Sequence, residues 1–156
     1  MEAKIVSKDK IKVIGMNVIT TQKNNTIPQL WNKFNPVACS IKNIAEPRIA
    51  LGICPHTDLK DFNEETEFEY ISGMIVTSFE EIPEGMMSYE VPAQRYAVFT
   101  HKGSLETLGE TYHSIYTDWF AKNDYEFQPG AEFELYDERF KFGAEDSEMD
   151  IYVPIK

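Results

Sequence analysis

The chain has 156 residues, of which 42% are hydrophobic and 26% charged, with a formal net charge of −11 and a pI near 4.7. The length suits one domain that buries a core without disulfides. The negative charge disfavours direct binding to nucleic acid or anionic membranes, and no apolar run is long enough for a membrane helix. The two cysteines show no metal or disulfide spacing, so we expect free thiols and a cytoplasmic protein.

The first half of the chain predicts three strands and one helix. β-branched residues or alternating polarity mark the strands, which are expected at residues 11–19, 48–54 and 68–76. Apolar residues at helical spacing follow Thr26, a possible N-cap, as far as Ile41, with an interruption at Pro36. The acidic stretch 56–67 is expected to be a surface loop, and residues 78–87 resemble a linker between two halves.

The second half repeats this order of elements. A strand is expected at residues 89–100, and a helix is then expected to begin at Ser104 as its N-cap. The apolar side chains of that helix recur at i, i+3 and i+4 up to Trp119. Two further strands are expected, one around residues 133–136 and one at residues 149–153.

Three matching separations favour an internal duplication. Gly15 and Trp31 are 16 residues apart, as are Gly103 and Trp119. Each half has a proline before its second strand, and an acidic–apolar run follows that proline 20 or 19 residues later. We therefore predict an α+β fold of two βαββ repeats, residues 1–80 and 86–156, in a single domain of residues 1–156. A pseudo-two-fold axis would place both helices on one face of an antiparallel sheet, with a ligand groove between the halves.

The alternation in residues 133–136 draws attention to one carboxylate. Glu134 and Tyr136 would share a face of the strand, opposite Phe133 and Leu135. If that face lines the groove, a carboxylate and a phenol point into it side by side. Most glutamates in strands are simply exposed, and the residues alone leave this alternative open.

The chain resembles the GyrI-like, or AraC-type, effector-binding domains, which also form the drug-binding part of multidrug-sensing transcription regulators. The order and spacing of four segments carry the resemblance: YISG at 70–73, VPAQRYAVFTHKG at 91–103, FELYD at 133–137 and DIYVPI at 150–155. The resemblance implies the duplicated βαββ fold with a central groove. The sequence shows no basic helix-turn-helix segment, so it is most similar to stand-alone or integron-cassette members of the family.

The resemblance also implies a ligand site of one buried glutamate surrounded by aromatic rings, and the glutamate carries over to Glu134. The rings expected beside it either lie on the same strand face as Glu134, belong to one of the four segments above, or occupy matching positions in the two helices. They are Tyr136, Tyr96, Tyr70, Tyr152, Trp119 and Trp31. Tyr112 and Ile115 are expected to pack in the core. No residue pattern indicates a catalytic group, a metal site or a cofactor.

The sequence is compatible with three functions. The first is capture of an amphipathic, cationic small molecule, with the carboxylate matching the ligand charge. The second is hydrolysis of electrophilic small molecules, with Glu134 as a general base, as the resemblance allows. The third is inhibition of a basic protein partner, such as a topoisomerase, by the acidic surface. Direct nucleic-acid binding and membrane association are not expected.

Overall fold

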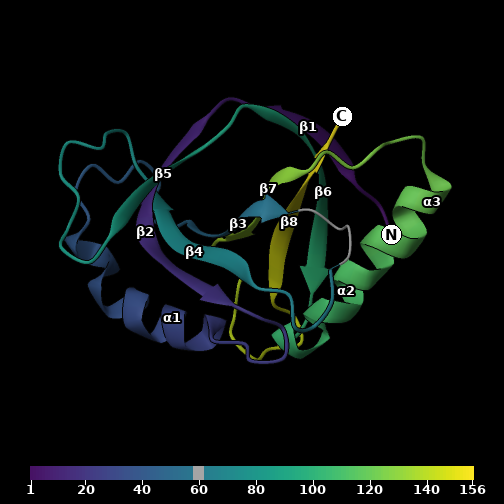
Figure 1. Ribbon diagram of the computed structural model, residues 1–156, viewed down its shortest axis with the longest axis horizontal. Coiled ribbons are helices and arrows are strands. Elements are labelled where there is room, and N and C mark those ends of the chain that lie inside the picture. The colour runs from purple at the N-terminus through teal and green to yellow at the C-terminus, as the bar shows by residue number, and fades with distance from the viewer. Residues whose placement is uncertain (58–61) are drawn as a thin grey trace.

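A computed structural model describes residues 1–57 and 62–156, and it places eight strands in one antiparallel sheet (Figure 1). The strands are β1 (Lys4–Lys8), β2 (Ile11–Thr20), β3 (Ala50–Thr57), β4 (Phe68–Ile75), β5 (Met87–Val91), β6 (Gln94–Lys102), β7 (Gly130–Tyr136) and β8 (Glu148–Ile155). The predicted loop 56–67 begins later than expected, because His56 and Thr57 continue β3. Its residues 58–61 lie outside the described part of the chain.

The strand order confirms the predicted duplication of the fold. The order across the sheet is β1-β6-β8-β7-β3-β4-β2-β5. If each strand of the first half is exchanged with its counterpart in the second half (β1 with β5, β2 with β6, and so on), the order is the same when read from the opposite edge of the sheet. The two halves meet at the central pair of β7 and β3, where Glu134 lies opposite Gly52.

Two strand predictions need correction. The segment predicted as one strand at residues 89–100 forms both β5 and β6, because Pro92 has no N–H for a ladder bond and the pairing partner changes there. β5 pairs with β2, whereas β6 pairs with β1 and β8. The short strand β1 was not expected, and each half therefore adds one edge strand to the sheet of the other half.

Both helices lie on the same face of the sheet, as predicted (Figure 1). The first consists of α1 (Ile27–Phe34) and a 3₁₀ helix, η1 (Asn35–Ser40), so the expected interruption at Pro36 is a change of helix type. The second runs through η2 (Leu105–Thr107), α2 (Leu108–Ser114), a π-helical turn η3 (Ile115–Trp119) and α3 (Phe120–Lys122). Within the described residues, no helix combines the length and apolar character needed to cross a bilayer.

The helix N-termini differ in how they are capped. The Ser104 hydroxyl accepts a hydrogen bond from the backbone N–H of Glu106, so the predicted cap is confirmed. The Thr26 hydroxyl instead donates to Oγ1 of Thr20, at 2.9 Å, and does not cap α1; the Ile27 N–H donates to Oδ1 of Asn25, at 2.9 Å. The hydrogen bond between Thr26 and Thr20 ties the start of α1 to the end of β2.

The spacing from glycine to tryptophan does not reflect structural equivalence. Gly15 lies within β2, where it faces Gly73 of β4; a Cβ at Gly15 would lie 2.0 Å from the Ser72 carbonyl oxygen. Gly103 instead follows β6 with a φ of 106°, a conformation that favours glycine. The duplication is therefore shown by the strand order and not by this spacing.

The apolar core is divided in a way that creates a hollow. Phe34, Ile14 and Met74 pack beneath α1, and a separate cluster around Phe99 and Ile115 packs beneath the second helix. The central strands contribute instead to a cluster on the opposite face of the sheet. Between the two helices, the central strands therefore present side chains that neither helical core covers.

Candidate functional site

Strand β7 directs two carboxylates toward the helix side of the sheet. Glu132 and Glu134 are only 6% and 8% exposed, although both are charged residues. Phe133 and Leu135 point to the opposite face, as the alternation predicted. Their cross-strand neighbours on β3 are small: Gly52 lies opposite Glu134 and Cys54 opposite Glu132. Small neighbours leave space above the central strands.

Three phenols hydrogen-bond to the Glu134 carboxylate. Tyr70 of β4 and Tyr136 of β7 donate to Oε1, at 3.0 and 2.8 Å. Tyr112 of α2 donates to Oε2, at 2.7 Å. No lysine, arginine or histidine among the described residues forms an ion pair with this carboxylate. The Glu134 carboxylate therefore receives hydrogen bonds from neutral donors only, and no positively charged side chain among the described residues pairs with it.

Helix α1 contributes Trp31 to the same cluster. The indole Nε1 donates to the Tyr70 hydroxyl, at 3.2 Å. The indole ring also meets the rings of Tyr70 and Tyr136 edge to face, with centroids 6.5 and 5.7 Å apart. Both helices, and strands from both halves of the chain, therefore supply aromatic groups to the surroundings of Glu134.

Gly52 allows Tyr70 to reach Glu134 across the intervening strand. A Cβ at this position would lie 1.9 Å from the Tyr70 hydroxyl oxygen and 3.1 Å from Oε1 of Glu134. Real Cβ atoms do not approach other atoms so closely, so any side chain here would push the phenol away.

The buried phenols remain hydrogen-bond donors. Burial raises the pKa of Tyr70, Tyr112 and Tyr136 well above the usual value for a phenol, and the nearby Glu134 charge raises the pKa of each one further. The three hydroxyls therefore stay protonated at physiological pH and keep their orientation toward the carboxylate.

Glu132 forms a second carboxylate centre beside the first. Tyr116 of η3 donates to its Oε2, at 2.6 Å, whereas its buried Oε1 has no hydrogen-bond partner among the described residues, since the nearby Thr57 hydroxyl donates to the Cys54 carbonyl, at 3.3 Å. Burial raises the pKa of Glu132 to about 7, and the charge of Glu134 adds to this effect. Near neutral pH the Glu132 carboxyl group is therefore partly protonated and partly ionised.

The structure brings together only some of the predicted site residues. Glu134, Tyr136, Tyr70 and Trp31 form one cluster. Tyr96 and Tyr152 instead pack against Phe133 on the opposite face, because they lie in the other phase of the sheet. The predicted placement of these two tyrosines beside Glu134 is wrong.

Trp119 also lies away from Glu134. Its ring packs at right angles against Phe99 and parallel to Tyr125, with centroids 5.0 and 5.6 Å apart, in the core beneath the second helix. Tyr112, expected to be a core residue, is the phenol that the second helix directs to Glu134. The sequence signal that could have found it is the i, i+4 pair of Tyr112 and Tyr116.

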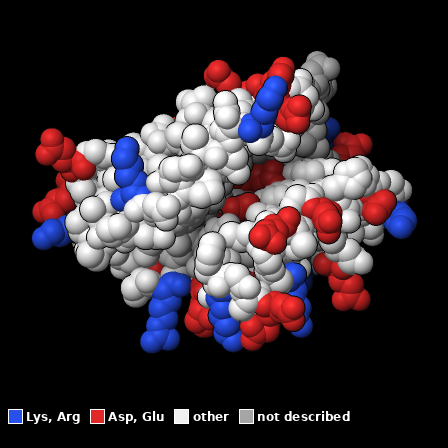
Figure 2. All heavy atoms as spheres, turned by 90° about the horizontal axis from the view of Figure 1, so that it is seen from below, with Lys and Arg blue, Asp and Glu red and all other residues white. Residues whose placement is uncertain are grey.

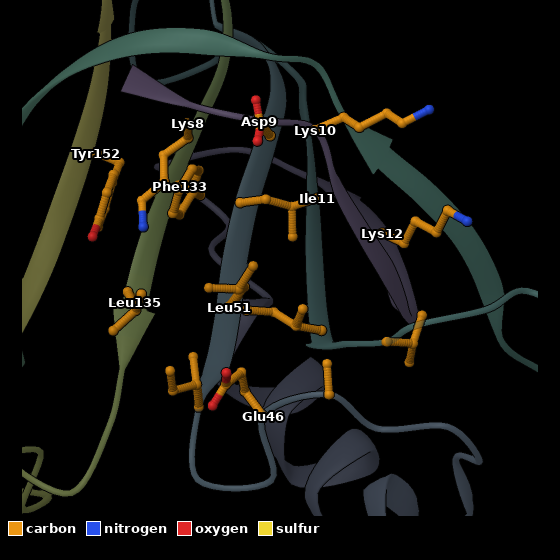
Figure 3. A pocket seen from close by; sticks show the side chains of 14 residues that line it. Lys8, Asp9, Lys10, Ile11, Lys12, Glu46, Leu51, Phe133, Leu135 and Tyr152 are labelled. Carbon is orange, nitrogen blue, oxygen red and sulfur yellow. The ribbon is translucent and has the colours of Figure 1, made fainter. Parts of the chain in front are cut away.

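Figure 2 shows the helix side of the molecule, with acidic atoms at the bottom of a hollow whose walls are mostly uncharged. A different groove, of about 550 Å³, lies on the opposite face of the sheet (Figure 3). Phe133, Tyr152 and Leu51 line it, and Lys8, Lys10 and Lys12 are at its margin. The Lys8 ammonium lies 5.8 Å from the centre of the Tyr152 ring. Asp9 and Glu46 also line that groove, but the three lysines leave it with a net positive charge, so it is less suitable for a cation than the hollow around Glu134.

The duplicated fold and its helix arrangement are those of the effector-binding class of domains. Residues 4–155 match the integron-associated effector-binding proteins known as Cass2, and the chain belongs to this family. This confirms the resemblance to GyrI-like effector-binding domains that the sequence segments indicated.

The chain is similar in sequence to one curated protein and in structure to two solved proteins. It is 36% identical over 156 residues to the transcriptional regulator BrlR of Pseudomonas aeruginosa (strain PAO1), covering 99% of this chain and 56% of BrlR. The chain thus spans about half the length of that relative. SAV2435 bound to tetraphenylphosphonium superposes with a TM-score of 0.78 at 15% identity, covering 100% of this chain and 94% of SAV2435. The integron cassette protein VCH_CASS2 of Vibrio cholerae gives 0.71 at 17%, covering 100% and 97%. These two likenesses show the shared fold.

Proposed function

We propose that this protein binds amphipathic organic cations in the hollow around Glu134. The observation that carries the proposal is a carboxylate, 8% exposed, that accepts hydrogen bonds from three tyrosines. Its surroundings supply no opposite charge within the described part of the chain. A buried charge is costly unless it is paired, so a ligand cation is the natural partner.

The walls of the hollow favour a lipophilic cation over a small hydrated one. The half-buried rings of Trp31 and Tyr136 offer apolar area and π faces, which attract cations by ~0.5–2 kcal/mol each. A cation whose charge is spread over a large apolar group loses little hydration energy on entry. The complex of SAV2435 with tetraphenylphosphonium supports the same class of ligand.

The proposal concerns a binding module in the cytoplasm. Both cysteines are free, which favours a reducing compartment. The net charge of −11 favours neither nucleic acid nor anionic membrane as a direct partner. Any influence on transcription, the role named for BrlR, would then require a further protein segment or a partner.

Calorimetric titration with tetraphenylphosphonium tests the proposal. The Glu134→Gln variant keeps the shape and the acceptor oxygen but removes the charge, so we expect at least a tenfold loss of affinity, about 1.4 kcal/mol. Tetraphenylborate, an anion of the same shape, should not bind the parent protein. The matched control Glu138→Gln removes a charge from an exposed turn next to β7 and should bind as the parent does.

Two results would contradict the proposal. One is equal binding of tetraphenylphosphonium by the parent and Glu134→Gln. The other is hydrolytic turnover of electrophilic esters that disappears in Glu134→Gln, because that result would make Glu134 a catalytic group and the protein an enzyme.

A further inference from the structure

Glu132 has no role in the proposed capture of a single positive charge, yet it is built into the same strand face. It is 6% exposed, and its partnerless Oε1 is buried. Leaving a buried acceptor without a partner is unfavourable, because the atom gives up its hydrogen bonds to water and gains none in return. Such a group marks a place where a ligand can supply the missing contact.

The two carboxylates form a pair with a defined separation. Residues i and i+2 of a strand point the same way, about 6.6–6.8 Å apart along the strand. Tyr112 and Tyr116, on successive turns of the second helix, donate to Glu134 and Glu132 respectively. Their rings lie nearly parallel, 12° apart in orientation with centroids 6.3 Å apart. The two phenols on the helix are thus spaced like the two carboxylates on the strand, and each phenol donates to one carboxylate.

We propose that Glu132 and Glu134 together form a two-carboxylate site that selects ligands carrying two cationic groups about 7 Å apart on an apolar frame. This inference rests on the proposed function, because it assigns one ligand cation to Glu134 and adds a second at Glu132. The second cation pairs with the Glu132 carboxylate, which is 6% exposed, and the aromatic frame lies against the tyrosine rings.

The groups that face Glu132 favour exchange of a proton for the second cation. They are Glu134 on β7, Tyr116 on η3, Tyr112 on α2, and Cys54 and Thr57 on β3. Burial and the two carboxylates raise the pKa of the Cys54 thiol, so it is neutral, as are the two phenols. None of these groups is positive. A ligand cation at Glu132 therefore displaces the proton that this carboxyl holds below about pH 7.

Two quaternary ammonium ligands test the inference. Their charges do not change with pH, so any pH dependence of binding comes from the protein. The two ligands are p-xylylenebis(trimethylammonium), with two cationic groups, and benzyltrimethylammonium, with one. The parent protein should bind the dication at least tenfold more tightly at pH 8. Its affinity for the dication should fall several-fold at pH 6, with a proton released on binding, measured by calorimetry in buffers of different ionisation enthalpy.

The Glu132→Gln variant provides the decisive comparison. It should lose the preference for the dication and the pH dependence while it still binds tetraphenylphosphonium, which also shows that it is folded. Glu138→Gln should retain the preference. An unchanged preference in Glu132→Gln overturns the inference, and so does a parent protein that binds both ligands equally. If tetraphenylphosphonium itself does not bind, the proposed function fails as well, so the two failures are distinguishable.

Discussion

At the scale of single residues, the contact between Gly52 and Tyr70 links sheet packing to the ligand site. In Gly52→Ala, the new methyl group would occupy the position of the Tyr70 hydroxyl. Because Tyr70 is 2% exposed, its ring has little room to move. We expect a loss of about 1–3 kcal/mol of unfolding free energy, which is typical of overpacking, together with weaker binding of tetraphenylphosphonium.

Chemical denaturation and titration of the same variant check this expectation. Gly109→Ala is the matched control, because a Cβ at Gly109 meets no atom within 4 Å and alanine is the better helix former. It should be as stable as the parent or slightly more stable. A Gly52→Ala protein with parental stability and parental affinity would show that Tyr70 does not need this space.

The buried Glu132 predicts how stability depends on pH. A carboxyl whose pKa is about 7 in the folded state, against 4.5 for an ordinary glutamate, binds its proton more tightly when the protein is folded. Its contribution is fully present below pH 4.5 and is lost as the pH rises through 7. The loss is at most roughly 3 kcal/mol. In Glu132→Gln that loss should be absent.

Denaturation midpoints at pH 5 and pH 8 give the measurement. The advantage of Glu132→Gln over the parent should be greater at pH 8 than at pH 5. In the exposed-site control Glu138→Gln the difference from the parent should hardly change. Parallel pH profiles for the parent and Glu132→Gln would contradict the assigned burial of this carboxyl.

At the scale of elements, the two helices differ in where they put their tryptophans. Trp31 of α1 contacts Tyr70 and Tyr136 beside Glu134, whereas Trp119 of η3 lies in the core. Tetraphenylphosphonium should therefore quench the fluorescence of Trp31 and leave that of Trp119 nearly unchanged. Trp31→Phe should lose most of the quenching, and Trp119→Phe should keep it. The opposite pattern would place the ligand elsewhere.

The site residues that could be predicted from the sequence are those whose placement depends on local interactions. The positions of Glu134 and Tyr136 were predictable, because the alternation of a strand is a local property. Tyr112 was not, because the face of a helix that meets a given strand depends on packing across the whole half. Tyr96 and Tyr152 were misplaced for a related reason. Their phase relative to β7 is set by the pairing of β8 with both β6 and β7, which no single segment encodes.

At the scale of the whole molecule, the duplication could be predicted but the exchange of edge strands could not. The order of strands and helices recurs along the chain, which is visible in the sequence. The pairing of β1 with β6 and of β5 with β2 joins segments that are far apart in the chain, and short strands carry little pattern. The separate helical cores then follow from the fold and leave the acidic hollow between them.

The exchanged edges also bear on how such a chain could have arisen. Each half lends its outermost strand to the other, so neither half completes its own sheet. A strand order that reads identically from both sides is what two copies of one short peptide would produce by trading their first strands. The present polypeptide thus has the layout of an ancestral swapped homodimer whose subunits became joined end to end. Once joined, the copies could diverge, and in this chain only the second carries the pair of glutamates at the shared seam.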